Sequence, residues 1–179
     1  RSLNITGYAE FTNNNNYEQD QVNLQYSMFI TRTAFEEDRI RQTIHGNLDG
    51  LEDGEEVDNK LAIDRFFGLA GAKVASYCGD REKFIGRYHG YGNPAGVING
   101  DLGGELGYNE NGCGALTTTL TLASGETKEI AFVLGMKYKD EADRILGSYE
   151  NPSQACAQEL KELVTYWHEK LSHFQVKTP

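Results

Sequence analysis

Apolar and polar residues alternate at the start of the chain. The apolar positions that share one face of an extended segment are Leu3, Ile5, Ala9 and Phe11. A period of two is typical of a half-buried strand, so the pattern predicts a strand over residues 3–11. After a polar tract, aromatic and β-branched residues return over 24–35, and they predict a second strand there.

The centre of the chain combines short apolar segments with many glycines. Small and aromatic apolar residues over 61–77, interrupted by Gly68 and Gly71, predict one or two strands. Glycine is then dense from Gly86 to Gly114, but the strand, G-x-G-x-x-G motif and helix of a dinucleotide site are missing. We therefore expect long loops that cover a sheet in this region.

Two further segments indicate a hairpin. Leucines share one face of 116–122, and apolar residues alternate over 129–135. The connection contains Gly125, which suits a turn between neighbouring antiparallel strands. Because strand patterns fill the first three-quarters of the chain, the sequence predicts a mainly β fold, an antiparallel β-sandwich.

The hydrophobic pattern changes to a helical period near the end of the chain. Asp140 can cap a short helix over 141–146, which Gly147 ends. A longer helix is predicted to start at Asn151-Pro152-Ser153-Gln154. Its asparagine occupies the cap, its proline the first turn and its glutamine the capping-box position.

One apolar stripe runs along this longer helix. Its members are Cys156, Leu160, Leu163, Val164, Trp167, Leu171 and Phe174. Their burial is worth on the order of 10–15 kcal/mol, so we expect the helix to dock on the sandwich or on a domain outside this sequence. The chain thus divides into a β-sandwich portion, residues 1–138, and a helical linker, residues 139–179.

The chain is acidic. Its 179 residues include 27 acidic and 17 basic side chains, and the formal net charge is −10. Nucleic acids and anionic membranes require clustered Lys and Arg, so neither is expected as a partner. No apolar run is long enough to span a bilayer, and no secretory leader is visible. A start inside a strand pattern indicates a piece of a larger protein.

Neither a metal site nor a cofactor is expected. Cys78, Cys113 and Cys156 are odd in number and widely spaced, which favours reduced, structural thiols in a cytoplasmic protein. The four histidines are scattered along the chain. The acidic segment 47–59 has some of the residues of a calcium loop, but the spacing is wrong, and Lys60 replaces the closing glutamate.

Two segments have side chains suited to binding a ligand. The tract 13–23 is rich in amides, which pair with sugar hydroxyls, and Tyr17 offers an apolar face for a pyranose ring. A plain solvated turn is the alternative for this tract. The residues that could line a second groove are Arg81, Tyr88, His89 and Tyr91. The alternative there is a glycine-hinged loop packed on the sheet. Neither segment contains a nucleophile–base motif or a P-loop.

Four segments together carry a family resemblance. They are Tyr8-Ala-Glu-Phe11, 81–94, 123–135 and 166–176. The second has the form R-x-x-F-x-G-x-Y-x-G-x-G-x-P, which is a fairly specific pattern. In this order they resemble the later part of the N-terminal β-sandwich domain of glycoside hydrolase family 94, the cellobiose-phosphorylase-like enzymes. The resemblance implies a supersandwich of the galactose-mutarotase-like type, followed by the start of a helical linker.

The resemblance also implies a reaction, an inverting phosphorolysis. Inorganic phosphate, a co-substrate, attacks the anomeric carbon of a β-glucoside while one carboxylic acid protonates the leaving oxygen. The products are α-glucose 1-phosphate and a shortened sugar. In the family, the acid and the phosphate-binding residues lie on an (α/α)6 barrel that would follow Pro179. We therefore expect no catalytic residue in this chain and no activity from the chain alone.

The resemblance places part of the polar tract near the substrate. In the family, the loop after the strand that corresponds to Tyr8-Ala-Glu-Phe11 reaches the active-site mouth and contacts the acceptor sugar. The residues thereby assigned to substrate binding are Asn15, Asn16, Tyr17, Gln19 and Asp20. Family members are typically homodimers with the sandwich at the interface, so a homodimer is expected here.

Two alternatives belong to other functional classes. A free-standing carbohydrate-binding module would need an exposed aromatic platform. The only tryptophan, Trp167, lies on the helix stripe that we expect to be buried, which counts against such a module. The other alternative is a structural or interaction domain without any sugar contact.

Overall fold

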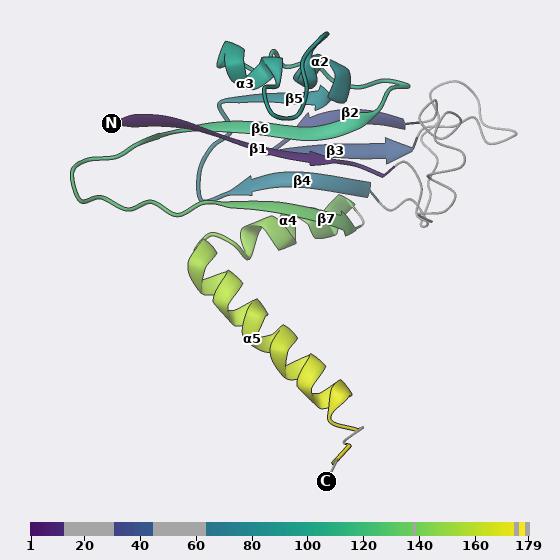
Figure 1. Cartoon of the computed structure of the whole chain (residues 1–179), viewed down its shortest axis with the longest axis vertical. Helices are drawn as coiled ribbons and strands as arrows, with labels where there is room; N and C mark the ends of the chain where they lie inside the picture. Colours follow the sequence, from purple (N-terminus) through teal and green to yellow (C-terminus); the bar gives the residue numbers. More distant parts are fainter. Residues whose placement is uncertain (13–30, 45–63, 138, 174–175, 178–179) are drawn as a thin grey trace, which may run out of the picture.

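The computed structural model describes residues 1–12, 31–44, 64–137, 139–173 and 176–177. In this part of the chain, strands form two sheets and helices lie outside them (Figure 1). The strands are β1 (Ser2–Glu10), β2 (Thr31–Glu36), β3 (Arg39–Ile44), β4 (Asp64–Ala70), β5 (Ser76–Asp80), β6 (Gly112–Thr121) and β7 (Ala131–Lys137). The helices are α2 (Arg81–Ile85), α3 (Ala95–Asn99), α4 (Lys139–Gly147) and α5 (Pro152–Leu171).

The two sheets form a sandwich. One sheet has the strand order β1-β6-β5, the other has the order β2-β3-β4-β7, and the strand pairs are antiparallel. Ile40, Phe67 and Leu116 form the centre of the apolar core, and they come from strands of both sheets. The predicted mainly β, antiparallel sandwich is therefore confirmed.

The first predicted strand is confirmed as β1, which pairs with β6 over its whole length. The face that the alternation assigned to polar residues is partly covered as well. There the ring of Tyr8 stacks on Phe84 of α2, with 4.5 Å between the ring centroids. The segment after β5 therefore covers part of the three-stranded sheet.

The second predicted strand is described only from Thr31, where β2 begins, because residues 24–30 lie outside the described residues. A tight turn at Glu37 and Asp38, both with positive φ, leads from β2 into β3. The sequence patterns did not predict β3. The predicted segment 61–77 is confirmed as strand-forming, since it contains β4 and the start of β5.

The predicted hairpin between β6 and β7 is wrong. β6 is the central strand of its sheet, with β1 on one side and β5 on the other, so no hydrogen-bonding edge is left for β7. β7 instead pairs with β4 in the second sheet, where Phe132 lies opposite Leu69. Alternating apolar residues show that one face of a strand packs on the core. The same alternation occurs in neighbouring strands of one sheet and in strands that face each other across a sandwich, so it does not identify the pairing partner.

The glycine-rich region forms long loops, as predicted, and also contains α3, while α2 lies directly before it. The carboxylate of Asp80 accepts hydrogen bonds from the backbone N–H groups of Glu82 and Lys83, at 2.9 and 3.1 Å, and so caps α2. The helix ends at Gly86, whose φ is 83°, and a Cβ there would lie 2.5 Å from the Cβ of Ala95. The two short helices lie together beside β5 (Figure 1).

The short helix predicted near residue 141 is confirmed as α4, which ends at Gly147. It packs on the four-stranded sheet through Ala142 and Leu146. The buried guanidinium of Arg39 on β3 donates a hydrogen bond to the carboxylate of Asp143. An apolar contact and an ion pair thus hold α4 against the sandwich.

The longer helix α5 begins at Pro152, as predicted, but the capping box is wrong. Asn151 makes no hydrogen bond with its side chain, and the N–H of Ser153 instead donates to the carboxylate of Glu129 at 3.3 Å. The predicted cap of α4 by Asp140 lies outside the described side chains.

The described members of the α5 stripe are exposed, so docking on the sandwich, one of the two expected arrangements, is wrong, and docking on a domain outside this sequence stays a prediction. The helix points away from both sheets (Figure 1). Leu163 is 53% exposed and Trp167 is 51% exposed. Trp167 is therefore not buried, and its expected burial no longer counts against a carbohydrate-binding module. Along the described residues, no helix has both the length and the hydropathy of a bilayer-spanning segment.

Candidate functional site

The residues predicted to bind substrate, Asn15, Asn16, Tyr17, Gln19 and Asp20, lie outside the described residues, and their role stays a prediction. The structure does describe the two positions between which that segment runs, Thr12 and Thr31. Both lie at the same end of the sandwich, where β1 ends and where β2 and β6 begin.

Thr12 is held by two buried polar side chains. The amide of Gln42 on β3 donates to the backbone carbonyl of Thr12 at 3.0 Å, and Nε of Arg65 on β4 donates to its hydroxyl at 3.4 Å. Gln42 is completely buried and Arg65 nearly so. Because buried polar groups are costly to leave unpaired, these contacts fix the chain at the point where the predicted substrate segment begins.

Thr31, at the other end of that segment, is held by the loop before β6. Its hydroxyl donates to the carbonyl of Glu110 at 3.3 Å, and its carbonyl accepts from the N–H of Asn109 at 2.9 Å. Two residues further on, the hydroxyl of Thr33 accepts from the N–H of Gly107 at 2.7 Å. The last part of the glycine-rich region therefore packs on β2 and positions its first residue.

An ion-pair network lies beside these contacts. The guanidinium of Arg41 donates to Asp64 at 2.9 Å and to Glu36 at 2.8 Å. Burial opposes the charge of Arg41, but the two carboxylates outweigh it and raise the pKa of Arg41 above its usual value. The network thus fixes Asp64, the first residue of β4, at the same end of the sandwich.

A second polar cluster joins β1 to the loop after α2. One oxygen of Glu10 accepts hydrogen bonds from the hydroxyls of Tyr8 and Tyr91, at 2.8 and 2.6 Å, and from Nε of Arg81 at 2.8 Å. Nη2 of Arg81 also donates to the hydroxyl of Tyr91 at 2.7 Å. The cluster is therefore closed on itself, with each member bonded to at least one other.

Burial opposes the ionisation of Glu10, but hydrogen bonds from Tyr91, Arg81 and Tyr8 outweigh it. They hold the pKa of this carboxyl below its usual value. Burial and the bond to Glu10 raise the pKa of Tyr8 above its usual range. A carboxylate that stays ionised at neutral pH is unsuited to act as a general acid, and the hydrogen bonds of Glu10 join β1 to the segment that follows β5.

An open cleft of about 670 Å³ adjoins this cluster. Its lining residues are Arg81, Glu82, Lys83, Ile85, Gly86, Arg87, His89, Gly90 and Tyr91. Three of the four residues predicted to line a groove are therefore brought together. Tyr88 is not among them, and it is 98% exposed. Sequence reasoning missed Lys83 and Arg87, although both lie inside the motif that carries the family resemblance.

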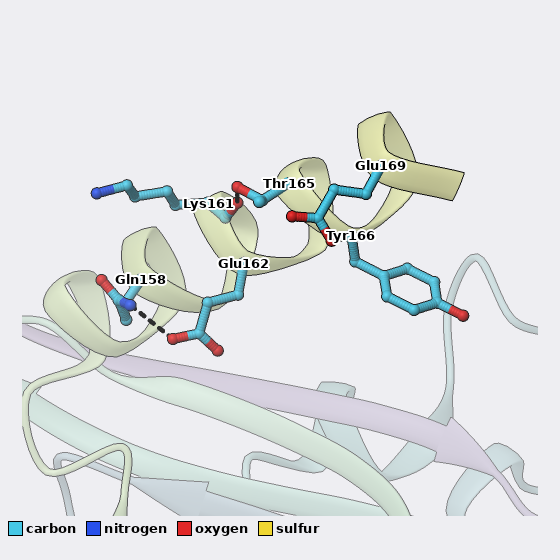
Figure 2. A pocket seen from close by; sticks show the side chains of 6 residues that line it. All are labelled: Gln158, Lys161, Glu162, Thr165, Tyr166 and Glu169. Atoms are coloured by element: carbon cyan, nitrogen blue, oxygen red, sulfur yellow. Dashed lines mark hydrogen bonds between the residues drawn. The ribbon is translucent and has the colours of Figure 1, made fainter. Parts of the chain in front are cut away.

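A smaller hollow of about 260 Å³ lies on α5 (Figure 2). All of its lining residues belong to this helix, and the amide of Gln158 donates to Glu162 at 2.5 Å across it. Figure 2 shows these side chains spread along successive turns of α5, and no other described element contributes to the lining. We therefore assign no site to this hollow.

The described residues contain no group of side chains arranged to hold a metal ion. Cys78 and Cys113 are buried, free thiols, as predicted, and burial raises the pKa of each. Both are therefore poor nucleophiles. Cys156 is also a free thiol but is exposed on α5.

The comparisons with known proteins agree with this architecture. The family model described as glycosyl hydrolase 94, supersandwich domain, matches residues 1–152. The chain is 26% identical over 179 residues to the N,N'-diacetylchitobiose phosphorylase of Vibrio furnissii, and 27% identical over 180 residues to that of Vibrio proteolyticus. In both cases the match covers 100% of this chain and 21% of the relative.

A third relative is the cyclic beta-(1,2)-glucan synthase NdvB of Rhizobium meliloti. It is 29% identical over 116 residues, which cover 64% of this chain and 4% of the relative. The chain spans about a fifth of the length of the phosphorylases that it matches. The family model covers most of the chain, including both sheets and α4. The chain therefore belongs to the glycosyl hydrolase 94 supersandwich-domain family.

Proposed function

We propose that this chain is the sandwich portion of an inverting sugar phosphorylase whose reactive groups lie in another part of the parent protein. The observation that carries the proposal is the match to two phosphorylases along the entire chain but only a fifth of their length. The Glu10 cluster supports it, because the carboxylate found there is held ionised and is unsuited to general acid chemistry.

At the anomeric carbon, the proposed reaction breaks one bond and forms one. A phosphate oxygen attacks the anomeric carbon of a β-linked glucosyl sugar from the face opposite the leaving group, and the glycosidic C–O bond breaks. A carboxylic acid of the parent's (α/α)6 barrel gives its proton to the departing oxygen. The products are an α-sugar 1-phosphate and a shortened sugar. Because two relatives are named for N,N'-diacetylchitobiose, that sugar belongs among the substrates to be tested.

The chain's own contribution is to shape the acceptor side of the active site. Asn15, Tyr17 and Asp20, with their neighbours Asn16 and Gln19, contact the acceptor sugar in this proposal. The contacts of Gln42 and Arg65 with Thr12, and of Glu110 with Thr31, support it. They fix both ends of the segment on buried strands, and precise positioning of a substrate contact needs such a rigid base.

The bare face of α5 is where the chain meets the rest of the parent. A stripe of large apolar side chains that is about half exposed is costly to leave in water. We propose that the catalytic barrel covers this stripe and that the sandwich contributes to a homodimer.

The test is phosphorolysis by the chain and by the parent protein, measured side by side. With α-glucose 1-phosphate and an acceptor sugar, or with phosphate and a β-linked disaccharide, the parent should turn over and the 179-residue chain should not. The parent serves as the positive control for the substrates. Turnover by the purified chain, retained through a further purification step, would contradict the proposal.

A further inference from the structure

The cleft beside α2 has an unusual charge for this protein. It is lined by the cations Arg81, Lys83 and Arg87 and by one carboxylate, that of Glu82, although the chain as a whole has a net charge of −10. Lys83 and Arg87 are exposed, and within the described residues neither makes an ion pair. Two cations that are free to donate at the edge of a cleft favour an anionic ligand.

Hydrogen bonds hold the frame of the cleft. Arg81 and Tyr91 are fixed to Glu10 by the hydrogen bonds described above. The turn that follows is closed by two bonds, one from the N–H of Gly90 to the side chain of Asn93 at 3.2 Å, and one from the N–H of Asn93 to the carbonyl of Gly90 at 3.1 Å. A preformed frame reduces the conformational entropy that a ligand must remove on binding.

The cleft also presents acceptors for hydroxyl groups. Nδ1 of His89 lies 2.9 Å from the carbonyl oxygen of Asn93. A carbonyl can only accept, so Nδ1 carries the proton, and in the neutral ring Nε2 is left as an acceptor. The carboxylate of Glu82 is a second acceptor. Tyr91, whose side chain is largely exposed, adds an aromatic surface.

The volume of the cleft favours an anionic organic molecule over a bare inorganic anion. A volume of about 670 Å³ is in the range of pockets that hold whole small molecules, and a bare inorganic ion would fill little of it. We propose that this cleft binds an anionic sugar. Lys83 and Arg87 hold the oxyanion group, and Glu82 and His89 accept hydrogen bonds from hydroxyls beside Tyr91. The oxyanion can be a phosphate ester or a carboxylate, because a guanidinium pairs with both.

The experiment is calorimetric titration of the full 179-residue chain at low salt with four probes. They are glucose 1-phosphate, glucuronate, inorganic phosphate and glucose. Saturable binding of at least one sugar anion, about tenfold tighter than binding of phosphate or glucose, is the expected result. Comparison of the ester with the acid then identifies which oxyanion the site takes.

Variants locate the site. Lys83→Ala combined with Arg87→Ala should weaken sugar-anion binding by about tenfold or more, since two charge-assisted bonds are lost. The matched control is Lys161→Ala together with Lys170→Ala on α5, which removes the same charge from a distant helix (Figure 1). Circular dichroism checks that each variant folds. No saturable binding, equal affinity for phosphate and for both sugar anions, or equal losses in both double variants would each overturn the proposal.

Discussion

The hydroxyl of Tyr91 donates a hydrogen bond of 2.6 Å to the carboxylate of Glu10, across 81 residues of sequence. Glu10 lies in the segment Tyr8-Ala-Glu-Phe11, and Tyr91 lies in the motif that begins at Arg81. Two of the segments that identify the family by sequence are therefore parts of one hydrogen-bonded cluster.

Glu10 should make the stability of the chain depend on pH. Folding lowers the pKa of Glu10 from its ordinary value near 4.5. Above that pH the carboxylate is ionised and stabilises the native state. This stabilisation is lost as the pH falls from that value through the lower folded pKa. In urea unfolding over a pH series, Glu10→Gln should lose less unfolding free energy than the unaltered chain in this range.

Glu126→Gln is the control for the Glu10 measurement. Its carboxylate also has a pKa below the usual value, through hydrogen bonding to the backbone N–H of Ala123, but it lies outside the cluster. Glu126→Gln should leave unchanged the contribution of the Glu10 cluster to the pH dependence of the unfolding free energy. Identical pH profiles for Glu10→Gln and the unaltered chain would show that the cluster adds nothing to acid stability.

Gly114 should not tolerate a side chain. It lies on β6 and faces β4 across the sandwich, and a Cβ there would be 2.4 Å from the Cβ of Phe67. Because both atoms are fixed close to the backbone, Gly114→Ala should reduce the unfolding free energy by about 1–3 kcal/mol. Gly147→Ala, where a Cβ meets open space, should change it by less than about 0.5 kcal/mol. Equal effects in denaturant titrations would argue against this close approach of the two sheets.

Leu163 should contribute to stability only when the rest of the parent is present. It is about half exposed on α5, so Leu163→Ala in the 179-residue chain should cost less than about 0.5 kcal/mol. In the parent, where we propose that the barrel covers this face, the cost should approach the 2–5 kcal/mol that is typical of a buried leucine. Leu116→Ala, at a fully buried position, should be costly in both. A negligible effect of Leu163→Ala in the parent would exclude α5 from the domain contact.

Tyr17→Ala should weaken acceptor binding in the parent. If Tyr17 contacts the acceptor sugar, steady-state kinetics should show a KM for the acceptor that is raised by roughly tenfold, with a much smaller change in the KM for phosphate. Tyr88→Ala removes another tyrosine, one that is almost fully exposed, and should leave both constants unchanged. Unchanged acceptor constants in Tyr17→Ala, and also in Asn15→Ala and Asp20→Ala, would remove this segment from the site.

Strong periodicity made β1 and α5 predictable, and the strand patterns along the first three-quarters of the chain made the sandwich predictable, in agreement with the family motifs. β3 was missed because Gln42 lies between Ile40 and Ile44 and interrupts their apolar alternation, while Arg39 and Arg41 take the other face of the strand. The charges of Arg39 and Arg41 are matched in the folded state by Asp143 on α4, by Asp64 on β4 and by the neighbouring Glu36. A buried glutamine that bonds to a backbone carbonyl 30 residues away gives no local signal for a strand.

The pairing partners of β6 and β7 could not be predicted for a different reason, and the same reason applies to the exposure of α5. A period shows that a strand or helix has an apolar face, but it does not show what lies against that face. In the cleft, Lys83 was missed because α2 spans only five residues, too few for a helical period to appear, and Arg87 lies in the loop that follows this helix.

Because Trp167 is the only tryptophan of the chain and lies on the uncovered face of α5, the protein contains its own fluorescent reporter. Its indole is about half exposed in the isolated chain, so its emission should be that of a partly hydrated ring. Any molecule that covers the helix would shift this emission to shorter wavelength without an added label. Assembly of this chain with the remainder of its parent could therefore be followed in real time by optical spectroscopy.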